Sequence, residues 1–409
     1  MNTSQTTCRI CHSPDIRRVL SLGTTPLADG LRRQEQLSQP EPAFPLNLAF
    51  CERCSLVQLL ETVSPEILFC QDYPYYSSFS PALLQHSQEN ALDLMRSRGL
   101  HAGSLVVELA SNDGYLLKNF VEHGIPVLGI DPAGGPARAA QKIGVPTICA
   151  FFGERLAHEL VDGGKAADLI IANNVLAHVA DLHGFVEGIR TLLKNDGIAV
   201  LEMPYVKDLV DHCEFDTIYH EHLCYFSMTA LERLFHMHSL FLNDVQHLTI
   251  HGGSLRIYVG KAEHPSPAAR DLLQAEASLQ VTRLAYYDDF AHKVGNIRNE
   301  LRQLLEDLKS KGAHIAAYGA AAKGSTLINY CGIGKQLVDF VTDRNTHKQG
   351  WFMPGQHIPV VATEVLLERM PDYLLLLAWN FAEEILKQQE EYRHRGGRFI
   401  IPVPAPRVV

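Results

Sequence analysis

The chain has 409 residues, too many for one ordinary hydrophobic core, so we expect two or three domains. Hydrophobic residues make up 46% and charged residues 20%, as in a soluble globular protein, and no apolar run approaches the roughly 20 residues of a membrane helix. The net charge of −10 argues against nucleic acid as a partner. The polar first residues contain no signal-peptide core, so we expect a cytoplasmic protein with no membrane partner.

Two pairs of cysteines, each spaced Cys-x-x-Cys, mark the start of the chain. Tetrahedral zinc takes four thiolates, and each pair supplies two of them. A redox motif would need only one pair, and four sulfurs leave no open position for catalysis. The chain has nine cysteines, an odd number in a cytosolic context, which argues against a disulfide framework. We predict a structural zinc ion bound by Cys8, Cys11, Cys51 and Cys54.

A segment rich in tyrosine and serine, residues 73–78, follows the cysteine pairs. It is either a lid over a bound cofactor or packing between the cysteine-bearing lobe and the next domain. As a lid, it would offer Ser78 to the cofactor and Tyr76 to the substrate.

Between residues 100 and 260, short apolar runs alternate with helical patterns, which is typical of an α/β domain with a mostly parallel sheet. We expect a helix at 115–123, directly after the first strand, and a later β-rich stretch that includes 254–259. The first four strands are expected at 105–109, 127–130, 169–172 and 197–202.

The first strand leads into residues 108–114, Glu-Leu-Ala-Ser-Asn-Asp-Gly. In class I methyltransferases this turn places an acidic residue and small residues beside the methionine part of S-adenosylmethionine. Asp131 ends the next strand, where two ribose hydroxyls can donate to its carboxylate. The loop lacks the Gly-x-Gly-x-x-Gly pattern of NAD-binding domains and leaves little room for a pyrophosphate. We predict S-adenosylmethionine, rather than NAD or an ordinary strand-to-helix turn, bound by Glu108, Ala110, Asn112, Asp131 and Pro132.

Further polar residues follow the strand at 169–172. Asn173 and Asn174 stand at its carboxyl end, where open α/β sheets bind ligands, so we add both to the predicted cofactor site. His178 follows one helical turn later. It either faces the transferred methyl group or serves as a capping or core residue.

The densest polar segment is 219–227, Tyr-His-Glu-His-Leu-Cys-Tyr-Phe-Ser. Its two histidines have the wrong spacing for two zinc ligands on one helical face, as in H-E-x-x-H enzymes. General acid–base chemistry suits these groups better, because histidine titrates near neutral pH and tyrosine can donate to a developing oxyanion. A surface cluster is the alternative.

One or two long helices are expected from about 267 to 311, followed by a second doubly wound α/β unit. The turn 318–324, Tyr-Gly-Ala-Ala-Ala-Lys-Gly, joins a strand to a helix, so its amides and Lys323 can meet a diphosphate. Asp343, Asn345 and Lys348 follow the next strand. The strands of this unit are expected at 313–318, 337–342, 373–378 and 398–401.

Taken in chain order, these motifs resemble those of the sugar C-methyltransferases of deoxysugar biosynthesis. The motifs are the cysteine pairs, Tyr-Ser-Ser, Glu-x-x-Ser-Asn-Asp-Gly, Tyr-His-Glu-His and the turn 318–324, of which the last two are specific. The resemblance covers essentially the whole chain. It implies methylation of C3 in a nucleotide-linked 4-keto-deoxyhexose, as in the tetronitrose, mycarose and noviose pathways. It also implies a zinc-binding lobe (1–72), a Rossmann-like methyltransferase domain (73–265) and a C-terminal Rossmann-like domain that helps to hold the sugar nucleotide (266–409).

The resemblance also implies roles for single residues. We expect proton abstraction alpha to the ketone, with His222 or Tyr219 as the base and Glu221 orienting or polarising a neighbour. Tyr73 and His178 would stabilise the enolate oxygen or position the sugar, and the choice among the tyrosines of 73–76 stays open. The implied catalytic residues are Tyr73, His178, Tyr219, Glu221 and His222, and the implied substrate contacts are Tyr76, Ala320, Lys323, Gly324, Asp343, Asn345 and Lys348.

Two other classes of function remain open. An NAD-dependent sugar-nucleotide oxidoreductase or epimerase would bind a dinucleotide at 108–114. A non-catalytic zinc-containing interaction protein would leave the cluster at 219–222 unexplained. We expect a monomer.

Overall fold

A seven-stranded, mostly parallel sheet forms the centre of the first α/β unit, with the order β12-β13-β10-β9-β6-β7-β8. The computed structural model describes residues 3–69 and 76–409. The parallel strands are buried on both faces, which explains their continuous apolar sequences. β12 and β13 pair in an antiparallel sense at one edge. The strands are β6 (Val106–Leu109), β7 (Val127–Ile130), β8 (Thr147–Ile148), β9 (Ala167–Asn173), β10 (Leu193–Pro204), β12 (Phe241–Leu248) and β13 (Ser254–Gly260).

Helices cover both faces of this sheet because alternate residues of each strand point to opposite sides. Val106 packs in one core with α2, α3 and α4, and Val107 packs in the other with α5, α6 and α8. The helix predicted at 115–123 begins only at Lys118. These helices are α2 (Pro81–Arg98), α3 (Lys118–Glu122), α4 (Gly134–Lys142), α5 (Glu154–Asp162), α6 (Leu182–Leu192) and α8 (Met228–His236).

The N-terminal lobe contains a four-stranded antiparallel sheet, in the order β11-β4-β3-β2. It was not predicted from the sequence, because two register shifts in the β2–β3 pairing interrupt the alternation of buried and exposed residues. Its edge strand, β11, comes from within the polar segment 219–227, far along the chain. The strands are β2 (Ile16–Pro26), β3 (Ala43–Cys51), β4 (Val57–Leu59) and β11 (Cys224–Tyr225), and the short pair β1 (Thr3–Ser4) and β5 (Glu61–Thr62) lies beside them.

The second α/β unit has a six-stranded sheet in the order β16-β15-β14-β17-β18-β19, parallel except for β19. The expected strands all form, but β15 is confined to Val341–Thr342. Its other elements are β14 (Ile315–Tyr318), β16 (Val360–Val361), β17 (Tyr373–Leu376), β18 (Arg398–Ile401), β19 (Arg407–Val408), α11 (Ala322–Cys331), α12 (Glu364–Arg369), α13 (Ala382–Gln388) and α14 (Glu390–His394).

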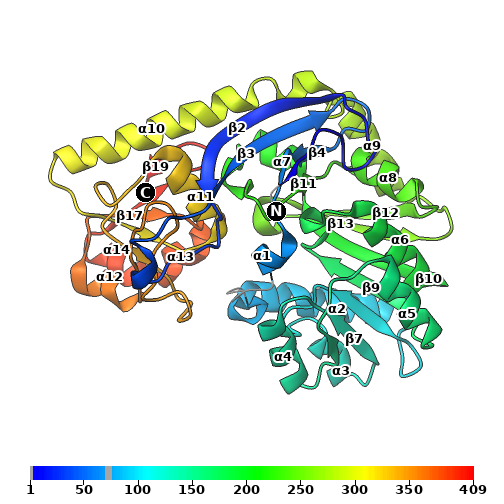
Figure 1. Ribbon diagram of the computed structural model, residues 1–409. Coiled ribbons are helices and arrows are strands. Elements are labelled where there is room, and N and C mark those ends of the chain that lie inside the picture. The colour runs from blue at the N-terminus through cyan, green and yellow to red at the C-terminus, as the bar shows by residue number, and fades with distance from the viewer. Residues whose placement is uncertain (1–2, 70–75) are drawn as a thin grey trace.

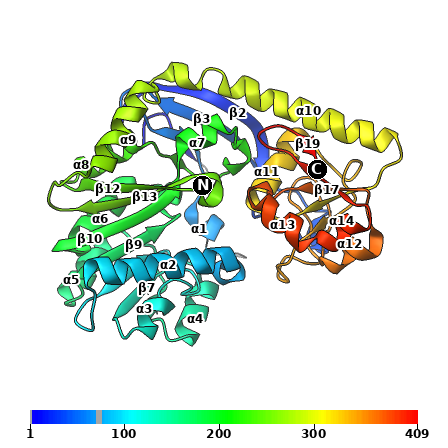
Figure 2. The ribbon, with the colours of Figure 1, turned by 180° about the vertical axis from the view of Figure 1, so that it is seen from behind.

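Helix α10 and strand β2 connect the two units. The predicted helical stretch forms α9 (Pro267–Ser278) and α10 (Phe290–Ser310), and α10 runs alongside β2 from one unit to the other (Figures 1 and 2). The apolar face of α10 packs into one core with β2, β3, α11 and β14. The zinc lobe is therefore part of the junction between the units. The predicted domain limits at 72 and 265 stay predictions. No helix within 3–69 or 76–409 is long and apolar enough to span a membrane.

Candidate functional site

The four predicted zinc ligands lie together, with all their sulfur atoms within 4.8 Å of one another. The Sγ atoms of Cys8 and Cys54 are 3.3 Å apart, and those of Cys11 and Cys51 are 3.5 Å apart. A tetrahedral zinc ion with Zn–S bonds of about 2.3 Å separates its sulfurs by about 3.8 Å. The cluster therefore fits a structural zinc ion with no open coordination position.

The zinc lobe holds the polar cluster in place. β4 of the lobe pairs with β11, which begins two residues after His222. The amide of Leu59 donates to the carbonyl of Leu223 at 2.9 Å, and the amide of Leu223 donates to the carbonyl of Ala177 at 2.7 Å. Residues 219–223 are thus fixed between the zinc lobe and the loop that carries His178.

The loop after β6 has a strained backbone. Ala110 and Asn112 have φ values of 55° and 49°, in the left-handed region that costs a residue with a side chain about 1–2 kcal/mol. The amide of Asn112 donates to Asp131 Oδ2 at 2.8 Å, and that of Ser111 donates to the carbonyl of Ile130 at 3.2 Å. The end of β7 therefore holds the loop in this conformation, as expected where strain serves a binding site.

Three buried carboxyl groups, Glu108, Asp113 and Asp131, surround this loop. Burial raises the pKa of Glu108 well above its ordinary value, and the charges of Asp131 and Asp113 raise it further. Burial also raises the pKa of Asp131, against the lowering effect of the Ala133 and Asn112 amides. Within the described chain, Glu108 Oε2 and Asp113 Oδ1 are buried without hydrogen-bond partners.

Unpaired buried acceptors call for a ligand that brings donors and positive charge. S-adenosylmethionine has a sulfonium, an ammonium group and two ribose hydroxyls, so the residues fit this cofactor. A dinucleotide would bring its negative pyrophosphate against three acidic groups. The site favours S-adenosylmethionine over NAD.

The predicted asparagines lie at the end of the neighbouring strand. Asn173 Oδ1 is another buried acceptor without a hydrogen-bond partner in the described part of the chain. The amide of Asn174 donates to the carbonyl of Glu202 at 2.7 Å. Both residues therefore stand at the carboxyl edge of the sheet, beside the cofactor loop.

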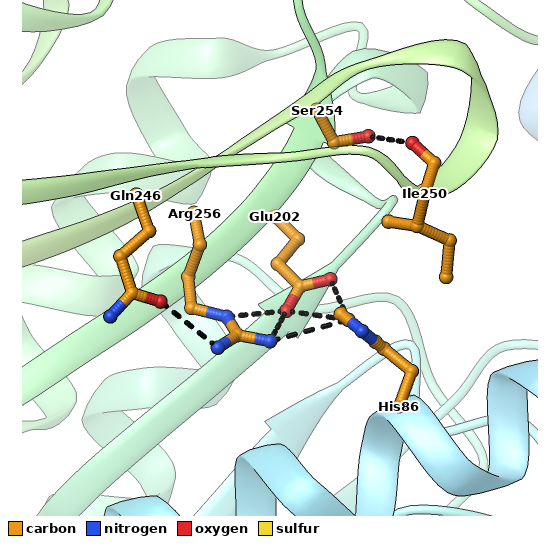
Figure 3. A network of polar contacts seen from close by, with 6 residues as sticks. All are labelled: His86, Glu202, Gln246, Ile250, Ser254 and Arg256. Atoms are coloured by element: carbon orange, nitrogen blue, oxygen red, sulfur yellow. Dashed lines mark hydrogen bonds and ion pairs between the residues drawn. The ribbon is translucent and has the colours of Figure 1, made fainter.

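Glu202 belongs to an ion-pair network at this same edge (Figure 3). It accepts hydrogen bonds from Arg256 Nε at 2.6 Å and from His86 Nε2 at 2.9 Å. Burial alone would raise the pKa of Glu202, but His86 and Arg256 outweigh it and keep the pKa below its ordinary value. Because His86 lies on α2, the network ties the helix that follows residues 76–79 to the edge of the sheet that carries the predicted cofactor residues.

The described part of the Tyr-Ser-Ser segment lies on the cofactor loop. The amide of Ser77 donates to Asn112 Oδ1 at 2.9 Å, and the amide of Ser78 donates to Asp113 Oδ2 at 3.2 Å. The ring of Tyr76 stacks on His347 of the second unit, with 5.8 Å between the centroids. Tyr73, the predicted active-site tyrosine, lies outside the described residues. The segment bridges the cofactor loop and the second unit.

Tyr219 and His222 form a hydrogen-bonded pair. The hydroxyl of Tyr219 lies 2.9 Å from His222 Nε2, and His222 Nδ1 lies 2.9 Å from the carbonyl of Thr217. A carbonyl can only accept, so in the neutral ring Nδ1 carries the proton and Nε2 accepts from Tyr219. The tyrosine is therefore hydrogen-bonded to a basic nitrogen.

His178 completes this group, because its ring lies 4.7 Å from the ring of His222. Burial lowers the pKa of His178 to about 4, so the side chain is neutral at pH 7. Its Nδ1 is buried and without a hydrogen-bond partner among residues 3–69 and 76–409. A neutral imidazole in this position can donate to, or accept from, a bound substrate.

The predicted substrate residues gather at the carboxyl ends of β14 and β15. Asp343 accepts from the amides of Ala320 at 2.6 Å and Asn345 at 2.7 Å, and Lys348 donates to the carbonyl of Ala320 at 2.8 Å. A Cβ on Gly324 would lie 2.8 Å from Leu377 Cβ, so only glycine lets α11 approach the sheet this closely.

Lys323 has a different environment from Lys348. Its ammonium lies 4.4 Å above the ring of Trp379, whose Nε1 donates to Asp216 at 2.6 Å. Burial lowers the pKa of Lys323, and the charges of Asp216 and Glu214 oppose this effect. Burial raises the pKa of Glu214 to about 7. The diphosphate contact proposed for Lys323 stays a prediction.

Several residues that shape the two candidate sites were not identified from the sequence. Trp379 is one of two tryptophans and follows a strand, which is a usable signal. Asp216 precedes the polar cluster, whereas Glu202, Arg256 and Asp29 lie in segments with no motif. Their partners come from distant parts of the chain, so only the fold reveals them.

Comparison with known proteins agrees with this architecture. Family models described as a putative zinc binding domain, a methyltransferase domain and a C-methyltransferase C-terminal domain match residues 8–69, 84–240 and 249–404. The C-methyltransferase NovU of Streptomyces niveus is 38% identical over 406 residues, which cover 98% of this chain and 96% of the relative. A ubiquinone biosynthesis O-methyltransferase of Azorhizobium caulinodans is 26% identical over 120 residues, 29% of this chain and 46% of that protein.

Solved structures resemble the chain over a smaller part. Magnesium protoporphyrin IX methyltransferase from Synechocystis PCC 6803, with bound S-adenosylmethionine, is 13% identical, with a TM-score of 0.34 over 44% of this chain and 79% of that chain. The predicted fold class, cofactor and structural zinc are confirmed by the family matches and the cysteine cluster. The chain belongs to the S-adenosylmethionine-dependent, zinc-binding C-methyltransferases.

Proposed function

We propose that the protein methylates C3 of a nucleotide-linked 4-keto-deoxyhexose through an enolate. The observation that carries this proposal is the Tyr219–His222 pair beside the neutral His178, at the edge of the cofactor-binding unit. Methylation of carbon needs a carbanion, and a ketone makes the neighbouring C–H acidic. A base and an oxyanion donor are therefore the groups that this reaction requires.

The pair supplies the base. The C3 proton leaves either directly to His222 Nε2 or to the Tyr219 oxygen, while the tyrosine proton passes to Nε2. The carbonyl of Thr217 holds Nδ1–H and stabilises the positive charge that develops on the ring. In both routes His222 is the final proton acceptor.

The electron pair left by the proton spreads onto the C4 oxygen. His178 is neutral at pH 7, and its neutral ring still carries one N–H that can donate to this oxygen. One preorganised donor to a developing oxyanion contributes about 3 kcal/mol. S-adenosylmethionine, when bound, supplies the electrophilic methyl group that C3 takes up.

The second unit supports a nucleotide as the other half of the substrate. The first-turn amides of α11, those of residues 322–324, precede the first intrahelical donor, Ser325, and follow a turn that Asp343 and Lys348 hold in place. A helix N-terminus binds phosphate groups well. His347, the residue before Lys348, stacks on Tyr76, which precedes the serines that contact the cofactor loop. A cytoplasmic location and a monomeric state stay predictions.

The test is incubation with S-adenosylmethionine and a set of nucleotide-linked 4-keto sugars, followed by mass spectrometry and NMR of the product. We expect one new methyl group on C3. Methylation of an oxygen, or no product with any 4-keto sugar, would contradict the proposal.

Variants test the base in single-turnover assays. His222→Asn is expected to lower methyl transfer by about 10³-fold, within the range for a general base. Tyr219→Phe separates the two routes, because a direct role of His222 would leave most of the rate. Exchange of the C3 proton with deuterated water, without cofactor, should be lost in His222→Asn.

A further inference from the structure

Three residues from separate segments meet where the second α/β unit contacts the segment before the polar cluster. The Lys323 ammonium lies 4.4 Å from the centre of the Trp379 ring, and Trp379 Nε1 donates to Asp216 Oδ2 at 2.6 Å. The lysine is in the first turn of α11, the tryptophan follows β17, and the aspartate is in the 3₁₀ helix η4 (Phe215–Thr217). One indole thus joins a cation at its ring face to an acid at its N–H, and we call these three residues the triad.

The charges of the triad are buried. Asp216 is 0% exposed, and Lys323 Nζ is buried without a hydrogen-bond partner in the described part of the chain. Burial raises the pKa of Asp216, and the charge of Lys323 and the N–H of Trp379 oppose the rise. A buried charge is strongly unfavourable unless it is compensated, so the cation and the acid depend on the indole between them.

Close packing of the backbone holds the lysine over the indole. A Cβ on Gly319 would lie 2.9 Å from Ala378 Cβ, and a Cβ on Gly324 would lie 2.8 Å from Leu377 Cβ. The turn before α11 and the first turn of this helix therefore lie directly against the residues that precede the tryptophan. The backbone amides of residues 322–324 are left as the phosphate-binding groups of this helix end.

Asp216 lies next to the residue that orients the proposed base. The carbonyl of Thr217 lies 2.9 Å from His222 Nδ1, so it keeps the proton on Nδ1 and leaves Nε2 basic. The hydroxyl of Thr217 donates to the carbonyl of Glu214 at 2.7 Å. Since the indole holds the side chain of the preceding aspartate, the direction of the Thr217 carbonyl depends on the triad.

Helix α11 also contacts the residues on both sides of this aspartate. The helix lies at the junction of the units, next to β2 and against η4 (Figure 1). The Thr326 hydroxyl donates to the carbonyl of Ile218 at 3.2 Å. The rings of Phe215 and Tyr330 have their centroids 5.3 Å apart. Both contacts come from residues of the helix that carries the lysine, so a shift of α11 would move the turn that orients the base.

We propose that the triad is a positioning device for His222, and that Lys323 is directed into it instead of to the diphosphate. Through the triad, the second unit fixes the turn that keeps Nδ1 protonated and Nε2 free to accept a proton. Asp216, Trp379 and Lys323 are therefore positioning residues, and their kinetic effects rest on the function proposed above.

The first test needs no substrate. The chain has two tryptophans, so Trp379→Phe and Trp351→Phe assign both indole N–H signals in NMR spectra of the full-length, zinc-loaded protein. The Trp379 signal should exchange slowly with deuterated water and should shift in both Asp216→Asn and Lys323→Met. Rapid exchange of this signal, or an unchanged chemical shift in either variant, would overturn the triad.

The imidazole of His222 reports the effect of the triad directly. Nitrogen-15 NMR distinguishes a protonated ring nitrogen from a bare one, and His222→Asn identifies the signals by their loss. Nδ1 should carry the proton in the parent protein, and the population of this tautomer should fall in Trp379→Phe, which keeps the ring and removes the N–H. Trp351→Phe is the matched control, because its indole also faces a cation, Arg33, at 4.7 Å. Equal tautomer populations in the parent and in Trp379→Phe, or an equal change in both variants, would contradict the proposal.

Kinetics and binding separate the inward role of the lysine from a phosphate contact. Lys323→Met should lower the single-turnover rate of methyl transfer about tenfold, and Lys323→Arg should restore most of it by returning a cation to the indole. Calorimetry uses whichever of UDP, dTDP, GDP and CDP the parent binds most tightly, and its dissociation constant should change less than about twofold in Lys323→Met. A dissociation constant raised about tenfold with an unchanged rate would show a diphosphate ligand and overturn the inward role.

A double-mutant cycle tests whether the triad acts through the base. Trp379→Phe alone should lower the single-turnover rate about tenfold, but less than about twofold in the His222→Asn background, where no imidazole remains to be oriented. A full tenfold loss in both backgrounds would mean that the indole acts independently of the base. Absence of turnover in the parent protein would refute the function proposed above, while the two NMR measurements would still decide the role of the triad.

Discussion

In both α/β units an aspartate after a strand accepts hydrogen bonds from two backbone amides, but the charges around the two loops are opposite. In the first unit, Asp131 at the end of β7 accepts from the amides of Asn112 and Ala133. In the second, Asp343 after β15 accepts from the amides of Ala320 and Asn345. In each case one carboxylate links the loop of the first strand to the end of its neighbour. The fold alone therefore does not distinguish the ligands of the two sites.

The residues around each loop make the distinction. The first loop is surrounded by three buried acids, and the second has Lys348 within hydrogen-bond distance of its turn. Helix α11 begins two residues after Ala320, whereas α3 begins six residues after Asn112. An early helix N-terminus with a cation suits a phosphate, and an acidic, irregular loop suits a sulfonium and hydroxyl groups. The comparison predicts separate sites for a cationic cofactor and an anionic substrate.

Zinc removal should produce the largest effect, because the zinc lobe joins the two units. Chelation at neutral pH should unpair β4 from β11 and lower methyl transfer by at least about 10³-fold, as expected where metal binding is coupled to folding. Circular dichroism and turnover after treatment with a strong chelator measure this. Readdition of zinc should restore activity. Full activity in metal-free protein would show that the lobe does not position the cluster.

Exchange of one aspartate at a time tests the comparison directly. Asp131→Asn should weaken S-adenosylmethionine binding about 100-fold, since it removes the charge that we propose for the ribose hydroxyls and weakens the hydrogen bond that fixes the loop. Asp343→Asn should leave this affinity unchanged and weaken the binding of a nucleoside diphosphate instead. Calorimetry of each variant with each ligand gives four dissociation constants to compare with those of the parent protein. Equal losses in both variants would mean that the two ligands share one site.

The half-buried His178 should make the first unit sensitive to acid. Burial lowers its pKa from 6.5 to about 4, so between these values the unfolded chain binds a proton that the folded chain does not. Stability should therefore fall as the pH drops from 6.5 to 4, by up to about 1.4 kcal/mol per pH unit from this group. Chemical denaturation of the parent protein and of His178→Asn, at several pH values, should show a smaller slope in the variant. His158→Asn, at an exposed position on α5, should keep the parent slope.

The sequence was sufficient for the features that depend on local pattern. The cysteine spacing gave the zinc ligands, and alternating strand and helix patterns gave both α/β units. The antiparallel sheet of the zinc lobe was missed, because its register shifts hide the alternation and its last strand comes from residues 224–225. Asp29 was missed for a related reason: its partner Lys348 lies in the second α/β unit, far along the chain, and no local spacing reports such a pair.

The smallest expected effect concerns the backbone of the two loops. Ala110 has a φ of 55°, so Ala110→Gly should relieve left-handed strain and raise the free energy of unfolding by about 0.5–1 kcal/mol, net of glycine's greater flexibility when unfolded. Gly319 has a φ of 94°, and a Cβ there would lie 2.9 Å from Ala378 Cβ, so Gly319→Ala should destabilise the second unit. Urea denaturation of both variants measures these opposite signs. If Ala110→Gly lowers stability instead, the alanine side chain contributes packing that outweighs its strain, and the first loop is not held under tension for its ligand.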